Sequence, residues 1–116
     1  MDNQTPYSYV FVRHDLSAAQ QIVQASHAAQ EAGFKYDRPE GPVHLVLFDI
    51  PDEEALLKVS EYIGVRGIDH VMFYETDIEA YTALATKPIY GKDRNVLSKY
   101  ELYCPEFAIK VDMNAN

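Results

Sequence analysis

The sequence predicts a single α/β domain in which helices flank a mixed four-stranded sheet, in the order β-α-β-α-β-β. Two runs rich in β-branched and aromatic residues are each followed by a helical pattern, and two further such runs come later in the chain. The length of 116 residues suits one domain, and no linker, repeat or low-complexity tract interrupts it. We place the domain over residues 1–116, with its core at about 7–100 and a C-terminal extension over 101–116.

The first strand is expected over residues 7–15 (YSYVFVRHD), and a helix follows it. Ser17 and Gln20 have the spacing of a capping box, and Gly33 stands where a left-handed C-cap would end the helix. Helical periodicity predicts a packing face made of Ala18, Ile22, Ala25, Ser26, Ala29 and Ala32. The opposite face would then present Gln20, Gln24, His27 and Glu31.

A turn over residues 38–42 leads to a strand at 43–50 (VHLVLFDI), whose continuous apolar character predicts cover on both faces. A second helix is expected from Pro51, with acidic residues in its first turn, with Leu56, Val59 and Ile63 on one face, and with Gly64 as its terminator. Third and fourth strands are expected over 69–74 and 81–86. A helical turn at 95–100, an edge strand at 106–111 and a frayed end over 112–116 complete the prediction.

The composition limits the classes of function. A single cysteine, Cys104, excludes an internal disulfide and the usual cysteine zinc sites, and no apolar run is long enough for a membrane span. The first residues lack the features of a secretory signal, and no phosphate-binding loop, dinucleotide fingerprint or nucleophile elbow occurs. We therefore expect a soluble cytoplasmic protein with no metal and no cofactor.

The charge is uneven along the chain. Eighteen acidic residues against ten basic ones give a formal net charge of -8, which repels nucleic acid at long range. Four cations nevertheless gather near the end of the chain, at Lys87, Lys92, Arg94 and Lys99. They form either an ordinary solvated loop or a patch that contacts phosphate.

A shallow cleft is predicted at the end of the first strand. Asp15 stands at that strand end, where open α/β sheets tend to bind ligands, and Gln20, Gln24 and His27 follow on the adjoining helix. The alternative is that Asp15 only stabilises the helix N-terminus and that the helix shows an ordinary solvated face.

Two segments carry a resemblance to a known family. Residues 12–16 (VRHDL) and 24–29 (QASHAA) resemble the opening of the type II peptidyl-tRNA hydrolases, with a strand ending in V-R-x-D-L and a helix containing Q-x-x-H-A-A. The later predicted elements follow in the family's order, and the resemblance covers about residues 7–100. It implies the fold of that family and hydrolysis of the ester that joins a peptide to the 3′ end of tRNA.

The resemblance also implies catalytic positions. Asp15 occupies the family's Asp position after the first strand, and Thr82 its Thr position on the fourth strand. Gln20 stands where the family has a lysine, and Glu75 where it has an aspartate, so this chain departs from the family at both. Gln24 and His27 would bind the substrate, and the partner would be tRNA or a nucleotide-like ligand. The four cations at Lys87, Lys92, Arg94 and Lys99 would contact its phosphates.

Two other functions stay open on the sequence. The missing lysine and the acidic charge favour a binding module that kept the cleft without hydrolysis. The apolar strands and many tyrosines favour a homo-oligomeric interaction protein, such as a homodimer.

Overall fold

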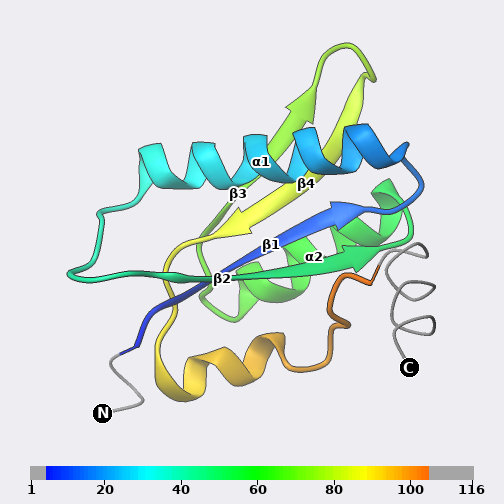
Figure 1. Cartoon of the computed structure of the whole chain (residues 1–116). Coiled ribbons are helices and arrows are strands. Elements are labelled where there is room, and N and C mark those ends of the chain that lie inside the picture. Colours follow the sequence, from blue (N-terminus) through cyan, green and yellow to red (C-terminus); the bar gives the residue numbers. More distant parts are fainter. Residues whose placement is uncertain (1–4, 105–116) are drawn as a thin grey trace, which may run out of the picture.

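The structure is a computed structural model that describes residues 5–104. It is an α/β domain with the predicted element order: β1 (Tyr7–Arg13), α1 (Ala18–Lys35), β2 (His44–Ile50), α2 (Glu53–Val65), β3 (His70–Glu75) and β4 (Ala80–Thr86) (Figure 1). A 3₁₀ helix, η2 (Gly91–Leu97), follows. The predicted edge strand at 106–111 and frayed end at 112–116 lie outside the described residues.

The four strands form one mixed sheet in the order β2-β1-β4-β3. β1 and β2 run parallel, as a strand–helix–strand connection requires, whereas β4 is antiparallel to both β1 and β3. The predicted α/β class and mixed four-stranded sheet are thus confirmed. No helix within residues 5–104 has the combination of length and apolar character needed to cross a bilayer.

The two faces of the sheet are packed differently. On the α1 face the buried residues are small: Val10, Val12, Ala28, Ala32, Ala83 and Ala85. The α2 face is built from larger side chains, among them Phe11, Phe48, Leu56, Ile63, Leu84 and Leu97. Small residues let α1 lie close to the strands, and this closeness is what brings polar side chains of α1 within hydrogen-bonding reach of β3 and β4.

The predicted packing face of α1 was right for Ala25, Ala29 and Ala32, which pack against the sheet, and wrong for its other three members. Ile22 is 68% exposed, and Ala18 and Ser26 also face solvent, while Gln24, Ala28 and Ala32 are buried. The helix is rotated from the orientation that apolar periodicity favours. The reason is that Gln24 finds hydrogen-bond partners on the sheet, and these bonds offset the cost of removing its amide from water.

Both predicted helix terminators were wrong by a few residues. α1 continues through Gly33 to Lys35, and Tyr36 caps it in an extended conformation. α2 continues past Gly64, and the left-handed glycine is Gly67, with φ +83°. Ile68 N–H donates to Ile63 O and Gly67 N–H to Gly64 O, which is the Schellman pattern.

The ends of other helices and strands also differ from the prediction. β1 ends at Arg13, so Asp15 lies in the turn after the strand, and the helical turn expected at 95–100 is a 3₁₀ helix at Gly91–Leu97. β2 is an edge strand whose α1 face is covered only in part: Leu47 packs against the cluster on that face, whereas Leu45 is 66% exposed. The cover predicted for both faces of the second strand is therefore complete only on the α2 side, because an apolar run can also border an open groove.

Candidate functional site

A buried amide, Gln24, is the centre of a hydrogen-bond network at the N-terminal part of α1. Its Nε2 donates to Gln20 Oε1 and to Glu75 Oε1, each across 2.9 Å, and its Oε1 accepts from Thr82 Oγ1 across 2.6 Å. Gln24 and Thr82 are both fully buried. Both N–H donors and the carbonyl oxygen of Gln24 are thus satisfied, and four residues from α1, β3 and β4 are held in one arrangement.

A β-bulge aims Thr82 at this network. The pairing of β3 with β4 passes from Phe73–Ala83 directly to Tyr74–Tyr81, so Thr82 has no partner in the register. Strict alternation would place Thr82 and Ala83 on opposite faces of the sheet, yet both face α1. Bulges of this kind re-aim single side chains beside functional sites.

Glu75 is the acidic member of the network. Its Oε1 accepts from Gln24, and its Oε2 accepts from the backbone N–H of Asp77 at 3.4 Å. The hydrogen bond from Gln24, followed by that from Asp77, lowers the pKa of the Glu75 carboxyl, and the nearby His27 ring adds to this direction. Glu75 is therefore ionised at neutral pH and has a charge with which to act on a ligand.

His27 lies beside the network on the same side of α1. Its ring stacks on Phe73, with centroids 4.5 Å apart and planes 3° from parallel. His27, one of the residues predicted to line the cleft, is thus half-buried and held in one orientation against β3, the strand that carries Glu75.

Asp15 is held by its neighbour Arg13. Arg13 Nε and Nη2 donate to the two carboxylate oxygens of Asp15 at 2.9 and 2.8 Å, and Nη1 donates to the carbonyl of Tyr81 at 3.0 Å. The hydrogen bond from Arg13 is the main reason why the pKa of Asp15 lies below its ordinary value. Within residues 5–104 no hydrogen bond joins Asp15 to Gln20 or Gln24, so Asp15 lies at the same sheet end but outside the network.

Two residues that the sequence did not single out fix the turn that carries Asp15. Gln21 Nε2 donates to Leu16 O at 2.7 Å and to His14 O at 3.3 Å, and its Oε1 accepts from the hydroxyl of Tyr103. Nothing in the sequence distinguishes Gln21 from the glutamines around it. Its role depends on Tyr103, which lies 82 positions later.

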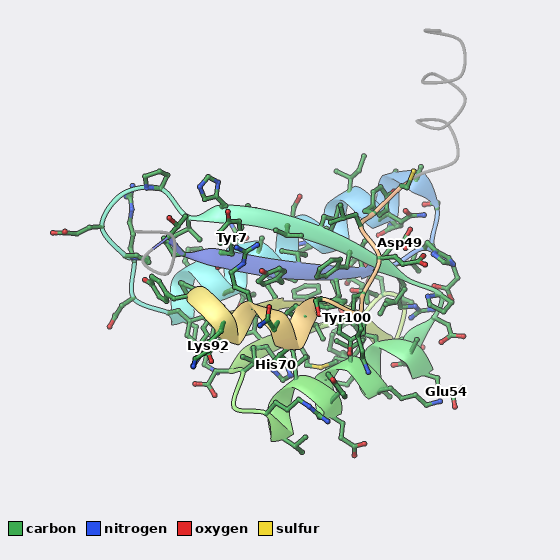
Figure 2. All side chains as sticks on the ribbon, turned by 90° about the horizontal axis from the view of Figure 1, so that it is seen from below. Tyr7, Asp49, Glu54, His70, Lys92 and Tyr100 are labelled. Atoms are coloured by element: carbon green, nitrogen blue, oxygen red, sulfur yellow. The ribbon has the colours of Figure 1, made fainter. Side chains whose placement is uncertain are left out.

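The four predicted phosphate contacts are not part of this site. Arg94 stacks over the ring of Tyr7 at 3.4 Å and donates to the hydroxyl of Tyr9 at 2.7 Å, and Lys99 lies over the ring of Tyr62 at 3.4 Å. Figure 2 shows Lys92 on the α2 side of the sheet, and Lys87 follows the far end of β4. The network faces α1, so the sheet separates it from the cations of η2.

No group of three or more His, Cys, Asp or Glu side chains able to hold a metal ion occurs in the part of the chain that the structure describes. Gln24 and Thr82 are fully buried, so the groups that can act on a ligand are the Gln20 amide and the carboxylates of Glu75 and Asp15. Such a set can orient a water molecule, accept a proton and donate neutral hydrogen bonds to a developing negative charge.

Comparison with known proteins gives one informative sequence relative. No protein-family model matches the chain. A human protein named "Putative peptidyl-tRNA hydrolase PTRHD1" is 29% identical over 113 residues, covering 82% of this chain and 80% of the human protein. This weak similarity supports a peptidyl-tRNA hydrolase-like family.

A solved structure shows the same fold. A protein of unknown function, Atu0240 from Agrobacterium tumefaciens strain C58, superposes with a TM-score of 0.62 over 90% of this chain and 99% of its own. The sequence identity is 14%, so this likeness concerns the fold alone.

Proposed function

We propose that this protein hydrolyses the ester of peptidyl-tRNA or N-blocked aminoacyl-tRNA, at the network centred on Gln24. The observation that carries the proposal is the meeting of Gln20, Glu75 and Thr82 on one buried amide. These are three of the positions at which the resemblance to type II peptidyl-tRNA hydrolases expects catalytic residues. The similarity to the human relative supports the same class of reaction.

Glu75 is the general base in this proposal. Its ionised carboxylate takes a proton from a water molecule, whose oxygen attacks the ester carbonyl carbon. The bond from that carbon to the ribose oxygen then breaks, and the proton passes to the ribose oxygen as it leaves. A carboxylate with a lowered pKa is a weaker base, but it stays deprotonated over a wider pH range.

Gln20 supplies the oxyanion contact. Its Oε1 accepts from Gln24, and within residues 5–104 its own NH₂ group has no acceptor, which leaves these donors for a substrate. A neutral amide stabilises an oxyanion less well than the lysine of the family. Loss of one preorganised donor typically costs about 10²–10³ in rate, so we expect slow turnover.

Gln24 and Thr82 act as positioning residues, because both are fully buried and cannot touch a substrate without a rearrangement. Thr82 fixes the amide of Gln24, and Gln24 orients Gln20 and Glu75. Asp15, with its side chain 39% exposed, orients the water or a ribose hydroxyl from the turn after β1.

Hydrolysis of an N-blocked aminoacyl-tRNA by the purified protein tests the proposal, beside the Asp15→Ala and Gln20→Lys variants. We expect slow turnover by the wild type, a loss in Asp15→Ala and a gain of about 10-fold or more in Gln20→Lys. Gln30→Lys is the matched control, since it adds the same charge to an exposed position of the same helix. A gain in Gln30→Lys as large as in Gln20→Lys would attribute the effect to general attraction of tRNA.

A second candidate function is a non-hydrolytic module that binds the end of a tRNA or a nucleotide-like ligand. The neutral Gln20 at the lysine position favours it. Binding of tRNA without hydrolysis in the wild type, together with activity in Gln20→Lys, would select this function.

A further inference from the structure

An apolar groove lies between α1 and β2, the edge strand of the sheet (Figure 1). We name it the α1–β2 groove. It consists of two hollows of about 210 and 230 Å³, whose walls share Val10, Ala29 and Leu45. The first hollow lies beside Leu47, and the second extends to Val43 at the start of β2. A continuous apolar strip of this kind marks a surface that another segment or molecule covers.

The apolar face of α1 is directed toward this groove. Ala25, Ser26 and Ala29 line the first hollow. Ile22 lies one turn before Ser26 on the same side of the helix and is 68% exposed. The face that helical periodicity predicts for packing is therefore only half used by the sheet. The sequence of α1 fits a helix that is covered on the groove side as well.

The outer edge of β2 also has backbone groups to offer. His44 N–H donates to Pro6 O, on the side of β1, and successive residues of a strand direct their backbone groups to opposite sides. Leu45 and Leu47 thus direct theirs to the open edge. Among residues 5–104, one hydrogen bond reaches them there, from Tyr103 N–H to Leu47 O at 2.8 Å. Such an edge is a template for a further strand.

The chain itself enters the groove at this point. Leu102 pairs antiparallel with Phe48, and Tyr103 lies opposite Leu47. The chain therefore runs from the end of β2 back toward its start, which is the direction in which the groove extends. Tyr103 also packs against the cluster on the α1 face of the sheet. The last described residues are thus tethered at the head of the groove and aimed along it.

The sequence after Cys104 alternates in the phase that Tyr103 sets. The Tyr103 hydroxyl donates to Gln21 of α1, whereas Leu102 and Cys104 are exposed. In an extended segment every second side chain lies on the same face. The residues that follow Tyr103 in this phase are all apolar: Pro105, Phe107, Ile109 and Val111. Those between them are mostly charged or small: Glu106, Ala108 and Lys110.

From this arrangement we propose that residues 105–111 occupy the α1–β2 groove as an extended segment, with Phe107, Ile109 and Val111 against its walls. The strand expected over residues 106–111 belongs to this segment. Its tether favours it over a second copy of the chain or a strand of another protein. A segment joined by a short linker has an effective concentration on the order of millimolar at its site.

The lengths of the segment and the groove agree. The four residues from Tyr103 to Phe107 span about 13 Å when extended, and so do the four from Leu47 to Val43. Phe107 is therefore placed beside Val43, at the second hollow. Pro105 has no N–H to donate to β2, so side-chain packing holds the segment more than a continuous ladder does.

Paramagnetic broadening in NMR spectra of the full chain tests the inference. A nitroxide is attached at Lys110→Cys in a Cys104→Ser background, and we expect the amide signals of Gly33 and Val43 to lose most of their intensity. The change Phe107→Asp/Ile109→Asp should restore these signals, because a carboxylate is costly to bury against an apolar wall. Ala108→Asp/Asn114→Asp is the matched control. It adds the same charge on the other face of the segment and should leave the broadening unchanged.

Three results would overturn the inference. The first is intact Gly33 and Val43 signals in the nitroxide-bearing chain, and the second is equal recovery in both double variants. The third is broadening that arises only when isotope-labelled protein without nitroxide is mixed with nitroxide-bearing protein, because a second copy then fills the groove. The spectrum of each variant reports its own folding. The inference does not depend on ester hydrolysis at the Gln24 network, and loss of either leaves the other standing.

Discussion

Thr82 donates its hydroxyl proton to Gln24 Oε1 across 2.6 Å, from a strand position that regular alternation would turn away from α1. The bulge opposite Phe73–Tyr74 makes this contact possible. Thr82, the bulge residue of β4, therefore supplies the hydrogen bond that the buried side-chain oxygen of Gln24 requires. The orientation of Gln20 and Glu75 follows from that amide.

Replacement of Thr82 by valine should destabilise the protein. Valine keeps the shape and removes the donor, so the buried Gln24 oxygen is left without its partner, at a cost of about 1–3 kcal/mol. Chemical denaturation followed by circular dichroism measures the change. Thr82→Ser retains the hydroxyl and should recover most of the stability, and a Thr82→Val variant as stable as the wild type would contradict the role given to this hydrogen bond.

Glu75 should titrate below the ordinary glutamate value of about 4.3. The native pKa is lowered, so the stabilisation from this carboxylate is present above the unfolded-state pKa and is lost as the pH falls through the native pKa. Carboxyl-carbon NMR titration measures the value. In Gln24→Met the main hydrogen bond is absent, and the pKa should move up. An unchanged pKa in that variant would contradict the role assigned to Gln24.

Removal of the Arg13 guanidinium should raise the pKa of Asp15. In Arg13→Met both hydrogen bonds to the carboxylate are absent, and the Asp15 pKa should return toward about 3.9. The same NMR titration measures it, with Arg38→Met as a control at an exposed site. If the Asp15 pKa stays low in Arg13→Met, groups other than Arg13 stabilise the ionised carboxylate of Asp15.

Replacing Gly33 and Gly67 by alanine should change the stability of the protein in opposite directions. A Cβ at either Gly33 or Gly67 meets no atom within 4 Å, so the backbone alone decides the outcome. Gly67 has φ +83°, and alanine there should cost about 1–2 kcal/mol. Gly33 lies inside α1, where alanine should stabilise by about 0.5–1 kcal/mol. Thermal unfolding of both variants measures this contrast, and changes of the same sign would contradict it.

The order of the elements could be predicted because it depends on local patterns. The β-rich run at 7–15 and the capping pair Ser17 and Gln20 act through neighbouring residues, and Ser17 does accept a hydrogen bond from the N–H of Gln20. The ends of the helices could not be placed from Gly33 and Gly64. A glycine ends a helix only where the following turn needs a left-handed residue, and here Gly67 meets that need.

The candidate site could be predicted only in part. Asp15, Gln20 and Gln24 were recognised from one short stretch, and Glu75 and Thr82 from the resemblance. The burial of Gln24 could not be foreseen, because its partners lie 51 and 58 positions away. A prediction from apolar periodicity places glutamine on the exposed face of a helix. The bulge that directs Thr82 toward α1 has no recognisable pattern in the sequence. The roles of all five residues, the tRNA partner and a homodimer stay predictions.

The most direct test of the central claim is the single-turnover hydrolysis rate of N-blocked aminoacyl-tRNA by the wild type and by Glu75→Gln. Glutamine still accepts the hydrogen bond of Gln24 but takes no proton from water, so we expect the rate to fall by about 10²-fold or more. Asp77→Asn removes a nearby exposed carboxylate as a control and should leave the rate unchanged. An active wild type with Glu75→Gln equally active would contradict the assignment of this network as the site of ester hydrolysis.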